Sequence, residues 1–118
     1  MKKNNIVKEK KDFDIVFKRG NQYKSGYAYI YIKDNDLKFQ RFGICVSKKI
    51  GNAVTRNKLK RRLKDIIDKS QLHFLNKDYI IVLKKSAVKA KYFDLKDDII
   101  SLLKKLNRQE NILYEEKK

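Results

Sequence analysis

Residues 47–61 of the chain read SKKIGNAVTRNKLKR, a basic loop that runs into a helix. The helix is predicted over residues 55–69, with Thr55 or Asn52 as its N-cap, because both side chains can accept a hydrogen bond from the first helical turn. Its apolar residues recur at helical spacing and predict one buried stripe. They are Leu59, Leu63, Ile66 and Ile67. This part of the chain is therefore expected to be an amphipathic helix packed on a neighbouring layer.

The charge of this segment has a single sign. Residues 47–64 hold eight lysines and arginines and no acidic residue. Arg56, Lys60 and Lys64 follow at intervals of four, so they form a row about a quarter-turn from the apolar stripe. A row in that position lies at the edge of the core and suits the wall of a groove. The alternative is a solvated helix side, but no Asp or Glu four residues away compensates the charge within the segment.

Two further segments have the pattern of helices. Residues 10–19 place Phe13, Val16 and Phe17 on one helical face. Residues 93–106 repeat leucine and isoleucine at the same spacing. Both segments are therefore predicted to be amphipathic helices that cover a sheet.

Three segments have the pattern of strands. Residues 27–32 alternate aromatic and β-branched side chains, and residues 37–46 are predicted to return antiparallel to them after a turn. The apolar run of residues 79–83 predicts a buried strand. With one further strand the order is α-β-β-β-α-β-α, a single-domain α+β sandwich of helices against about four strands. Residues 1–8 and 108–118 are expected to be mobile.

Composition excludes several classes of protein. The 118 residues are enough for one domain, and 31 Lys+Arg against 14 Asp+Glu give a net charge of +17. Such a charge points to a polyanionic partner, although a general preference for lysine contributes to it. Cys45 and His73 are the only residues of their types, so neither an internal disulfide nor a structural zinc site is expected. No apolar run reaches membrane-spanning length, and the chain is predicted to be cytoplasmic.

The aromatic residues suggest what the basic surface contacts. Tyr27, Tyr29 and Tyr31 alternate along one strand and should share one face of the sheet. Together with Phe13 and Phe17 they could stack unpaired bases beside a basic groove. Taken alone, the two phenylalanines are better explained by core packing, and the tyrosines are equally well explained by a half-exposed sheet face.

The quoted stretch resembles the protein subunit of bacterial ribonuclease P. The family signature is Val-Ser-Lys-Lys-x-Gly-x-Ala-Val-x-Arg-Asn-Arg-x-Lys-Arg, and the spacing here matches it without a gap. Residues 12–20, DFDIVFKRG, are similar to the family's first helix, and residues 78–82, DYIIV, to its last strand. The resemblance covers nearly the whole chain. It implies a left-handed β-α-β crossover, against the usual right-handed preference.

The resemblance also implies a function. The family's ribonucleoprotein endonuclease removes the 5′ leader from precursor tRNA by phosphodiester hydrolysis. Its RNA subunit holds Mg²⁺ and performs catalysis, so no catalytic or metal-binding residue is expected in this chain. The implied partners are ribonuclease P RNA and precursor tRNA, with no membrane and no small-molecule substrate.

Specific residues carry these implied roles. Phe13, Phe17 and Tyr31 would line a cleft for the single-stranded leader. The loop and the basic helix would bind RNA through Lys48, Lys49, Asn52, Arg56, Asn57, Lys58, Lys60, Arg61 and Lys64. Two of these depart from the family pattern. Lys58 stands in place of an arginine, which keeps the charge but loses the bidentate fork, and Lys64 stands where arginine is common. Arg62 adds charge at a position that is often apolar.

Two other functions stay open on sequence alone. A ribosome-associated or general RNA-binding structural protein would share the basic face without any role in cleavage. A stand-alone metal-dependent nuclease would need an acidic cluster for its metal ions, and no group of carboxylates in the sequence has the pattern of a two-metal site.

Overall fold

The computed structural model describes residues 1–116, and the side chains of residues 1–108. Its main elements are α1 (Lys10–Arg19), β1 (Asn21–Lys24), β2 (Ala28–Asp34), β3 (Arg41–Cys45), α2 (Ala53–Lys69), β4 (Lys77–Leu83) and α3 (Tyr92–Glu116). Three short 3₁₀ helices are η1 (Lys3–Asn5), η2 (Lys48–Ile50) and η3 (Lys85–Lys89). The predicted order α-β-β-β-α-β-α is confirmed, with β1 as the further strand.

The four strands form one mixed sheet in the order β1-β2-β4-β3. β1 pairs antiparallel with β2, β2 pairs antiparallel with β4, and β3 pairs parallel with β4. The prediction that residues 37–46 return antiparallel to the preceding strand is therefore wrong. β4 lies between them because it carries apolar side chains on both of its faces, and such a strand is best buried at the centre of a sheet. Its residues Tyr79, Ile80 and Ile81 are 1% exposed or less.

The parallel pair β3 and β4 is joined through α2, which forms the β-α-β unit that the family resemblance implies. The left-handed sense of this crossover stays a prediction. Because parallel strands end at the same edge of a sheet, the segments after β3 and β4 emerge at the same end of the molecule.

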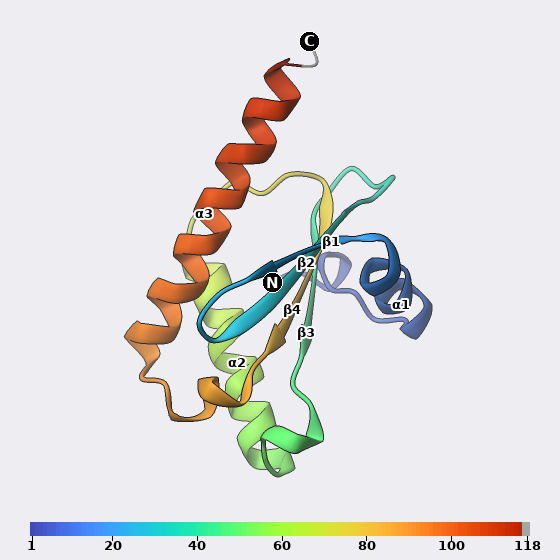
Figure 1. Cartoon of the computed structure of the whole chain (residues 1–118). Coiled ribbons are helices and arrows are strands. Elements are labelled where there is room, and N and C mark those ends of the chain that lie inside the picture. The colour runs from blue at the N-terminus through green and yellow to red at the C-terminus, as the bar shows by residue number, and fades with distance from the viewer. Residues whose placement is uncertain (117–118) are drawn as a thin grey trace.

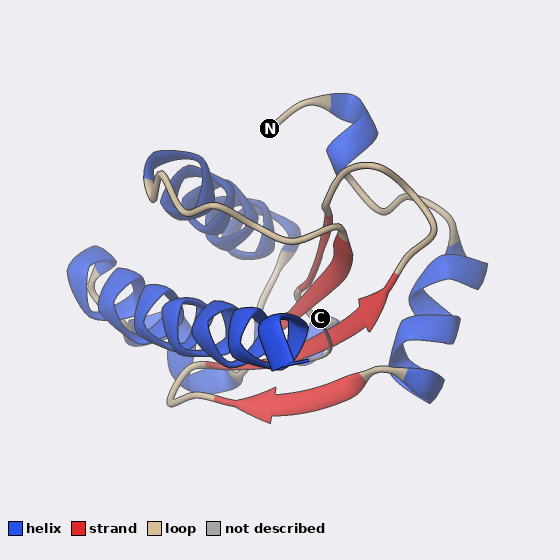
Figure 2. Ribbon diagram, turned by 90° about the horizontal axis from the view of Figure 1, so that it is seen from above, coloured by secondary structure: helices blue, strands red, loops and turns tan. Residues whose placement is uncertain are grey.

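Helices cover the two faces of the sheet unequally (Figures 1 and 2). α2 and α3 cover the face that we call the closed face, and the shorter α1 lies against the opposite, open face. Adjacent residues Ile80 and Ile81 belong to the two different clusters, as expected where side chains alternate along a strand. The closed-face core includes Ile30, Ile81, Leu63, Ile66, Leu95, Ile99 and Leu103.

Helix boundaries differ from the prediction at two points. α2 begins two residues earlier than expected, since Asn52 is the N-cap and accepts a hydrogen bond from the Thr55 amide at 2.9 Å. α3 runs from Tyr92 to Glu116, well beyond the predicted end at residue 106. The mobility expected of residues 1–8 and 108–118 stays a prediction. Residues 117 and 118 lie outside the described part of the chain. None of the described helices is long and apolar enough to span a membrane.

The first eight residues make more contacts than the sequence predicts. Val7 is 3% exposed, and its amide donates to the Phe42 carbonyl at 2.8 Å. Ile6 forms a parallel bridge to Phe42. This segment therefore runs along the outer edge of β3 and covers part of it.

Candidate nucleic-acid interface

The three aromatic residues predicted to line a leader cleft lie together on the open face. Phe13 and Phe17 come from α1, with ring centres 6.4 Å apart. Phe17 meets Tyr31 of β2 edge-on, with ring centres 4.9 Å apart. Phe17 is 39% exposed although it is a large apolar residue. The structure thus forms an aromatic strip (Phe13, Phe17 and Tyr31), while its contact with RNA stays a prediction.

Gly43 of β3 provides the space under this strip. A Cβ atom at this position would lie 2.6 Å from Cε1 of Phe13 and 3.1 Å from Cδ1 of Ile80. The first distance is far shorter than a van der Waals contact, so any larger residue would push the Phe13 ring away from the sheet.

The other two tyrosines of the predicted strand, Tyr29 and Tyr27, lie on different faces of the sheet. Tyr29 alternates with the buried Ile30, and the Lys84 Nζ atom lies 4.7 Å from the centre of its ring. Tyr27 instead packs against the closed-face core, so the prediction that all three tyrosines share one face is wrong for this residue. The reason is that β2 begins at Ala28, which leaves Tyr27 in the preceding turn, where alternation does not apply.

A charged network joins α1 to the sheet. Arg41 of β3 donates to Asp78 of β4 through Nε at 2.8 Å and through Nη2 at 2.6 Å. Its Nη1 atom donates to Asp12 of α1 at 3.4 Å, and Asn35 donates to Asp78 at 2.8 Å. The hydrogen bond to Asp78 raises the pKa of Arg41 above its ordinary value, against the opposing effect of burial. Sequence reasoning missed Arg41, although Asp12 and Asp78 both fall in the stretches that resemble the family.

The predicted RNA-binding side chains lie on η2, at the N-cap of α2 and on residues 56–64 of α2. Most of them are exposed: Lys48, Lys49, Asn52, Asn57, Lys58, Arg61 and Lys64. Asn52 also has the structural role of N-cap. Arg56 and Lys60 are partly buried, and so is Arg62.

Lys60 and Arg56 place the basic row at the rim of the open face. Burial raises the pKa of the Cys45 thiol above its ordinary value, and the positive charge of nearby Lys60 opposes this shift. Cys45 packs against the small open-face cluster, so Lys60 lies near this cluster, while the role of the whole row as the wall of a groove stays a prediction. The Nε atom of Arg56 is buried and has no hydrogen-bond partner within the described residues.

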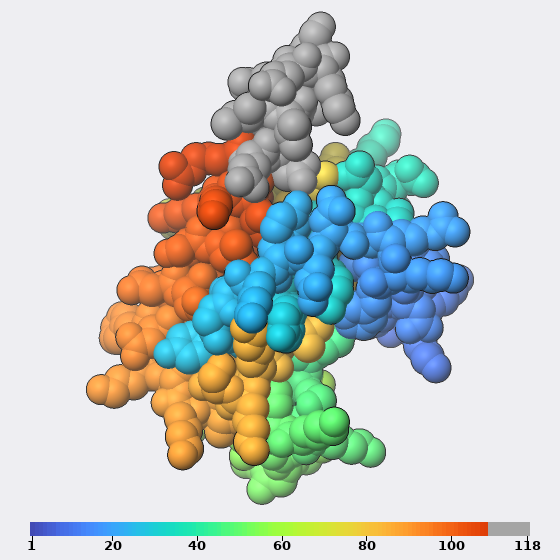
Figure 3. Space-filling view, in the orientation of Figure 1, coloured from blue at the N-terminus to red at the C-terminus, as the bar shows by residue number. Residues whose placement is uncertain are grey.

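Charges on this end of the molecule are not neutralised. Within the described part of the chain, no lysine or arginine of residues 47–64 lies within ion-pair distance of an acid. η2 also contacts η3, where Lys85 and Lys89 are exposed. Figure 3 shows these segments side by side at the lower end, green for η2 and the start of α2 and yellow-orange for η3. The sequence marked residues 84–91 as basic, but only the parallel pairing of β3 and β4 joins them to η2.

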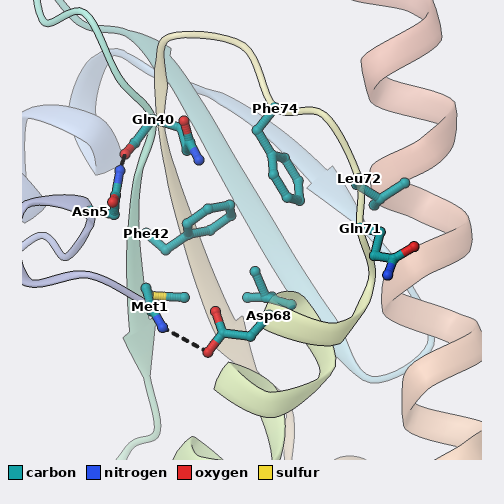
Figure 4. Close-up of a pocket in the computed structure, with 9 residues that line it drawn as sticks. Met1, Asn5, Gln40, Phe42, Asp68, Gln71, Leu72 and Phe74 are labelled. Atoms are coloured by element: carbon teal, nitrogen blue, oxygen red, sulfur yellow. Dashed lines mark hydrogen bonds and ion pairs between the residues drawn. The ribbon is translucent and has the colours of Figure 1, made fainter.

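A separate pocket of about 190 Å³ lies at the other end of α2 (Figure 4). Phe42 and Phe74 line it, and their rings meet edge-on with centres 4.8 Å apart. At its rim the Met1 amino group donates to Asp68 at 2.9 Å. No lysine or arginine lines this pocket, so it is distinct from the basic surface.

In the part of the chain that the structure describes, the acidic, cysteine and histidine side chains form no group of three that could hold a metal ion. Asp98 accepts hydrogen bonds from the amides of Gly26 and Tyr27, both at 2.9 Å, and so holds the turn before β2. His73 is exposed in the loop after α2.

Comparison with known proteins identifies the family of this chain. The sequence model of the Ribonuclease P family matches residues 1–107. The chain is 37% identical over 108 residues to the ribonuclease P protein component of Mycoplasma mycoides subsp. mycoides SC, covering 90% of this chain and 99% of that protein. It is 35% identical over 114 residues to the corresponding protein of Streptococcus pneumoniae, covering 94% of this chain and 93% of that one.

Solved structures show the same fold. One is a Staphylococcus aureus RNase P protein mutant with defective mRNA degradation activity, with a TM-score of 0.83 and 30% identity over 89% of this chain and 90% of that one. Another is the RNase P protein of Thermotoga maritima, with a TM-score of 0.77 and 25% identity over 84% of this chain and 94% of that one. The chain therefore belongs to the family of ribonuclease P protein components, a part of the endoribonuclease holoenzyme that acts with an RNA partner in the 5′ processing of tRNA.

Proposed function

We propose that this chain holds the single-stranded 5′ leader of precursor tRNA on the open face and binds the RNA subunit of ribonuclease P through residues 47–64. The observation that supports this is the aromatic strip on the open face, together with a basic row that has no acidic partner among the described residues and whose Lys60 lies near Cys45 of the open-face cluster. A single strand needs both features, because its bases are free to stack and its phosphates repel one another.

The aromatic strip suits leaders of different sequence. Every base has a π-face, so stacking on Phe17 or Tyr31 contributes about 1–3 kcal/mol per base with little preference among bases. The partly exposed Phe17 ring is the member of the strip most accessible to such a base. Recognition would then depend on the leader being unpaired, which is the property that precursor tRNAs share.

Arg56 is the strongest candidate for a phosphate contact. It is only partly buried, and it has no acidic partner within the described residues. Its planar guanidinium can bind phosphate through two parallel hydrogen bonds. The neighbouring Lys60 would add a point charge on the same side.

Catalysis belongs to the RNA subunit in this proposal. Mg²⁺ held by that RNA supplies the hydrolytic chemistry, and this chain contributes no catalytic group. Its residues position the substrate strand and neutralise phosphates where the two RNAs meet. We place the protein in the cytoplasm, a reducing compartment that suits its one free thiol, Cys45.

The decisive experiment is reconstitution at low Mg²⁺. The chain is mixed with a bacterial ribonuclease P RNA that is inactive under these conditions, and 5′ cleavage of precursor tRNA is measured. We expect the protein to restore cleavage, and the Arg56→Ala/Lys60→Ala variant to do so much less. Binding without cleavage would favour a general RNA-binding protein, and cleavage without the RNA subunit would identify a protein nuclease.

Cys45 provides a second, direct test of the leader site. It is the only cysteine of the chain and lies partly exposed on the open face. Its rate of alkylation in the holoenzyme should fall when precursor tRNA binds and should change much less with mature tRNA. Equal protection by the two tRNAs would place the leader elsewhere.

A further inference from the structure

α1 buries few apolar side chains against the sheet, so apolar packing alone fixes its position only weakly. Among its ten residues only Val16 is buried, and Ile15 and Phe17 are 46% and 39% exposed. An isolated helix of this length is unstable in water and depends on tertiary contacts for its position. The helix nevertheless carries two of the three rings in the aromatic strip.

Arg41 supplies the missing tie between α1 and the sheet. Its fork is held in place by two hydrogen bonds to Asp78, whose carboxylate is almost wholly buried. Since the guanidinium is already oriented, its remaining Nη1 donor can hold Asp12 of α1 without further loss of side-chain freedom. Arg41 therefore joins three elements: α1, β3 and β4.

Asp12 and Arg41, the two residues of this contact, both lie close to Phe13. Asp12 immediately precedes Phe13 on α1, and Arg41 stands two residues before Gly43 on β3, the position over which the Phe13 ring lies. Phe13 contacts Phe17, and Phe17 contacts Tyr31. A shift of α1 at Asp12 would therefore move the first ring of the strip and, through it, the second.

The arm to Asp12 can be broken without opening the core. The side chains of Arg41 and Asp12 are 19% and 26% exposed, and both line a surface pocket of about 320 Å³. The Arg41–Asp78 pair lies deeper, with only 7% of the Asp78 side chain exposed. The two arms of the network are thus separable by mutation.

We propose that Arg41 is a positioning residue for leader recognition, which holds Asp12 and Asp78 together and thereby sets the place of Phe13 and Phe17 over the open face. This inference rests on the proposed leader site. It assigns Arg41 no contact with RNA. Its effect passes through α1, so it alters discrimination between precursor and mature tRNA rather than affinity for the RNA subunit.

The test compares Asp12→Asn with Asp14→Asn in the reconstituted holoenzyme. Both variants remove one negative charge from α1, but the exposed side chain of Asp14 makes no hydrogen bond or ion pair within the described residues. We expect Asp12→Asn to lower the ratio of precursor to mature tRNA affinity about fivefold, within the range for residues that act on a site without touching its ligand. Asp14→Asn should leave this ratio unchanged, and Asp12→Glu should restore part of it.

Further measurements separate positioning from simple loss of stability. Affinity for the RNA subunit alone and the thermal midpoint should be nearly the same for the two Asn variants. Arg41→Met, which also removes the ion pair to the buried Asp78, should lower both discrimination and the midpoint. Equal discrimination by the Asp12→Asn and Asp14→Asn holoenzymes would overturn the proposal. If the wild-type holoenzyme itself did not prefer precursor tRNA, the proposed leader site would fail instead.

Discussion

The two faces of the sheet use the same strands for opposite purposes. On the closed face Ile30 and Ile81 are fully buried under α2 and α3. On the open face Tyr31, next to Ile30 in sequence, is half-buried beside the exposed ring of Phe17. The alternation of side chains lets one strand contribute to stability on one face and to recognition on the other. Substitutions on the two faces should therefore affect different measurements.

The largest effect is expected on the closed face. Leu63 of α2 has no exposed surface, and Leu63→Ala should lower the free energy of unfolding by about 2–5 kcal/mol through lost burial and the cavity left behind. Denaturant unfolding measures this loss. A change below about 1 kcal/mol would show that the closed face is not the main source of stability.

On the open face the same truncation should affect binding instead. Phe17→Ala should weaken precursor tRNA binding by about 1–3 kcal/mol through the loss of a stacking surface, with little change in stability. Ile15→Ala is the matched control, because Ile15 is an exposed apolar residue of the same helix. Competition between precursor and mature tRNA measures the difference, and an equal effect of the two variants would contradict the assignment.

A smaller effect concerns the basic row at the rim. With about 5–8 phosphate contacts, the plot of log affinity against log salt should have a slope of roughly −4 to −6. Arg56→Ala should make this slope less steep by about 1, since it removes one contact. Arg108→Ala is the control, because Arg108 is an exposed arginine on α3. A slope that is nearly flat in the wild type would remove the electrostatic basis of the interface.

The smallest effect tests the place of Lys60 beside the open face. Its positive charge lowers the pKa of Cys45, so Lys60→Met should raise that pKa further above its ordinary value. The thiolate then forms at higher pH, and the pH profile of Cys45 alkylation should move in the same direction. Lys58→Met, an exposed control on the same helix, should leave the profile in place. A lowered pKa in Lys60→Met would contradict this geometry.

Local features of the fold could be predicted from sequence because they depend on short-range patterns. The apolar stripe of Leu59 and Leu63 at helical spacing predicted α2, and both residues are buried as expected. The quarter-turn between that stripe and the Arg56–Lys60 row predicted a basic rim beside the sheet, and the effect of Lys60 on Cys45 agrees with it. Phe13 and Phe17 were placed on one face by the same reasoning.

Strand pairing could not be predicted in this way. The turn after β2 suggested an antiparallel hairpin with residues 37–46, but β4 takes the place beside β2. A strand that is apolar on both faces leaves the least apolar surface exposed when it lies at the centre of the sheet, and the competition for that place depends on residues far apart in sequence. The role of Arg41 could not be predicted for the same reason, because its partners Asp12 and Asp78 lie 29 and 37 residues away in sequence.

The sequence by itself determined that three helices form, where three of the four strands lie, and that positive charge is concentrated in residues 47–64, because periodicity and composition are local properties. Only the tertiary structure decided that β3 runs parallel to β4, that η3 joins η2, and that Arg41 ties α1 to the sheet. These arrangements arise from burial and charge pairing between distant segments, and such contacts exist only once the chain has folded.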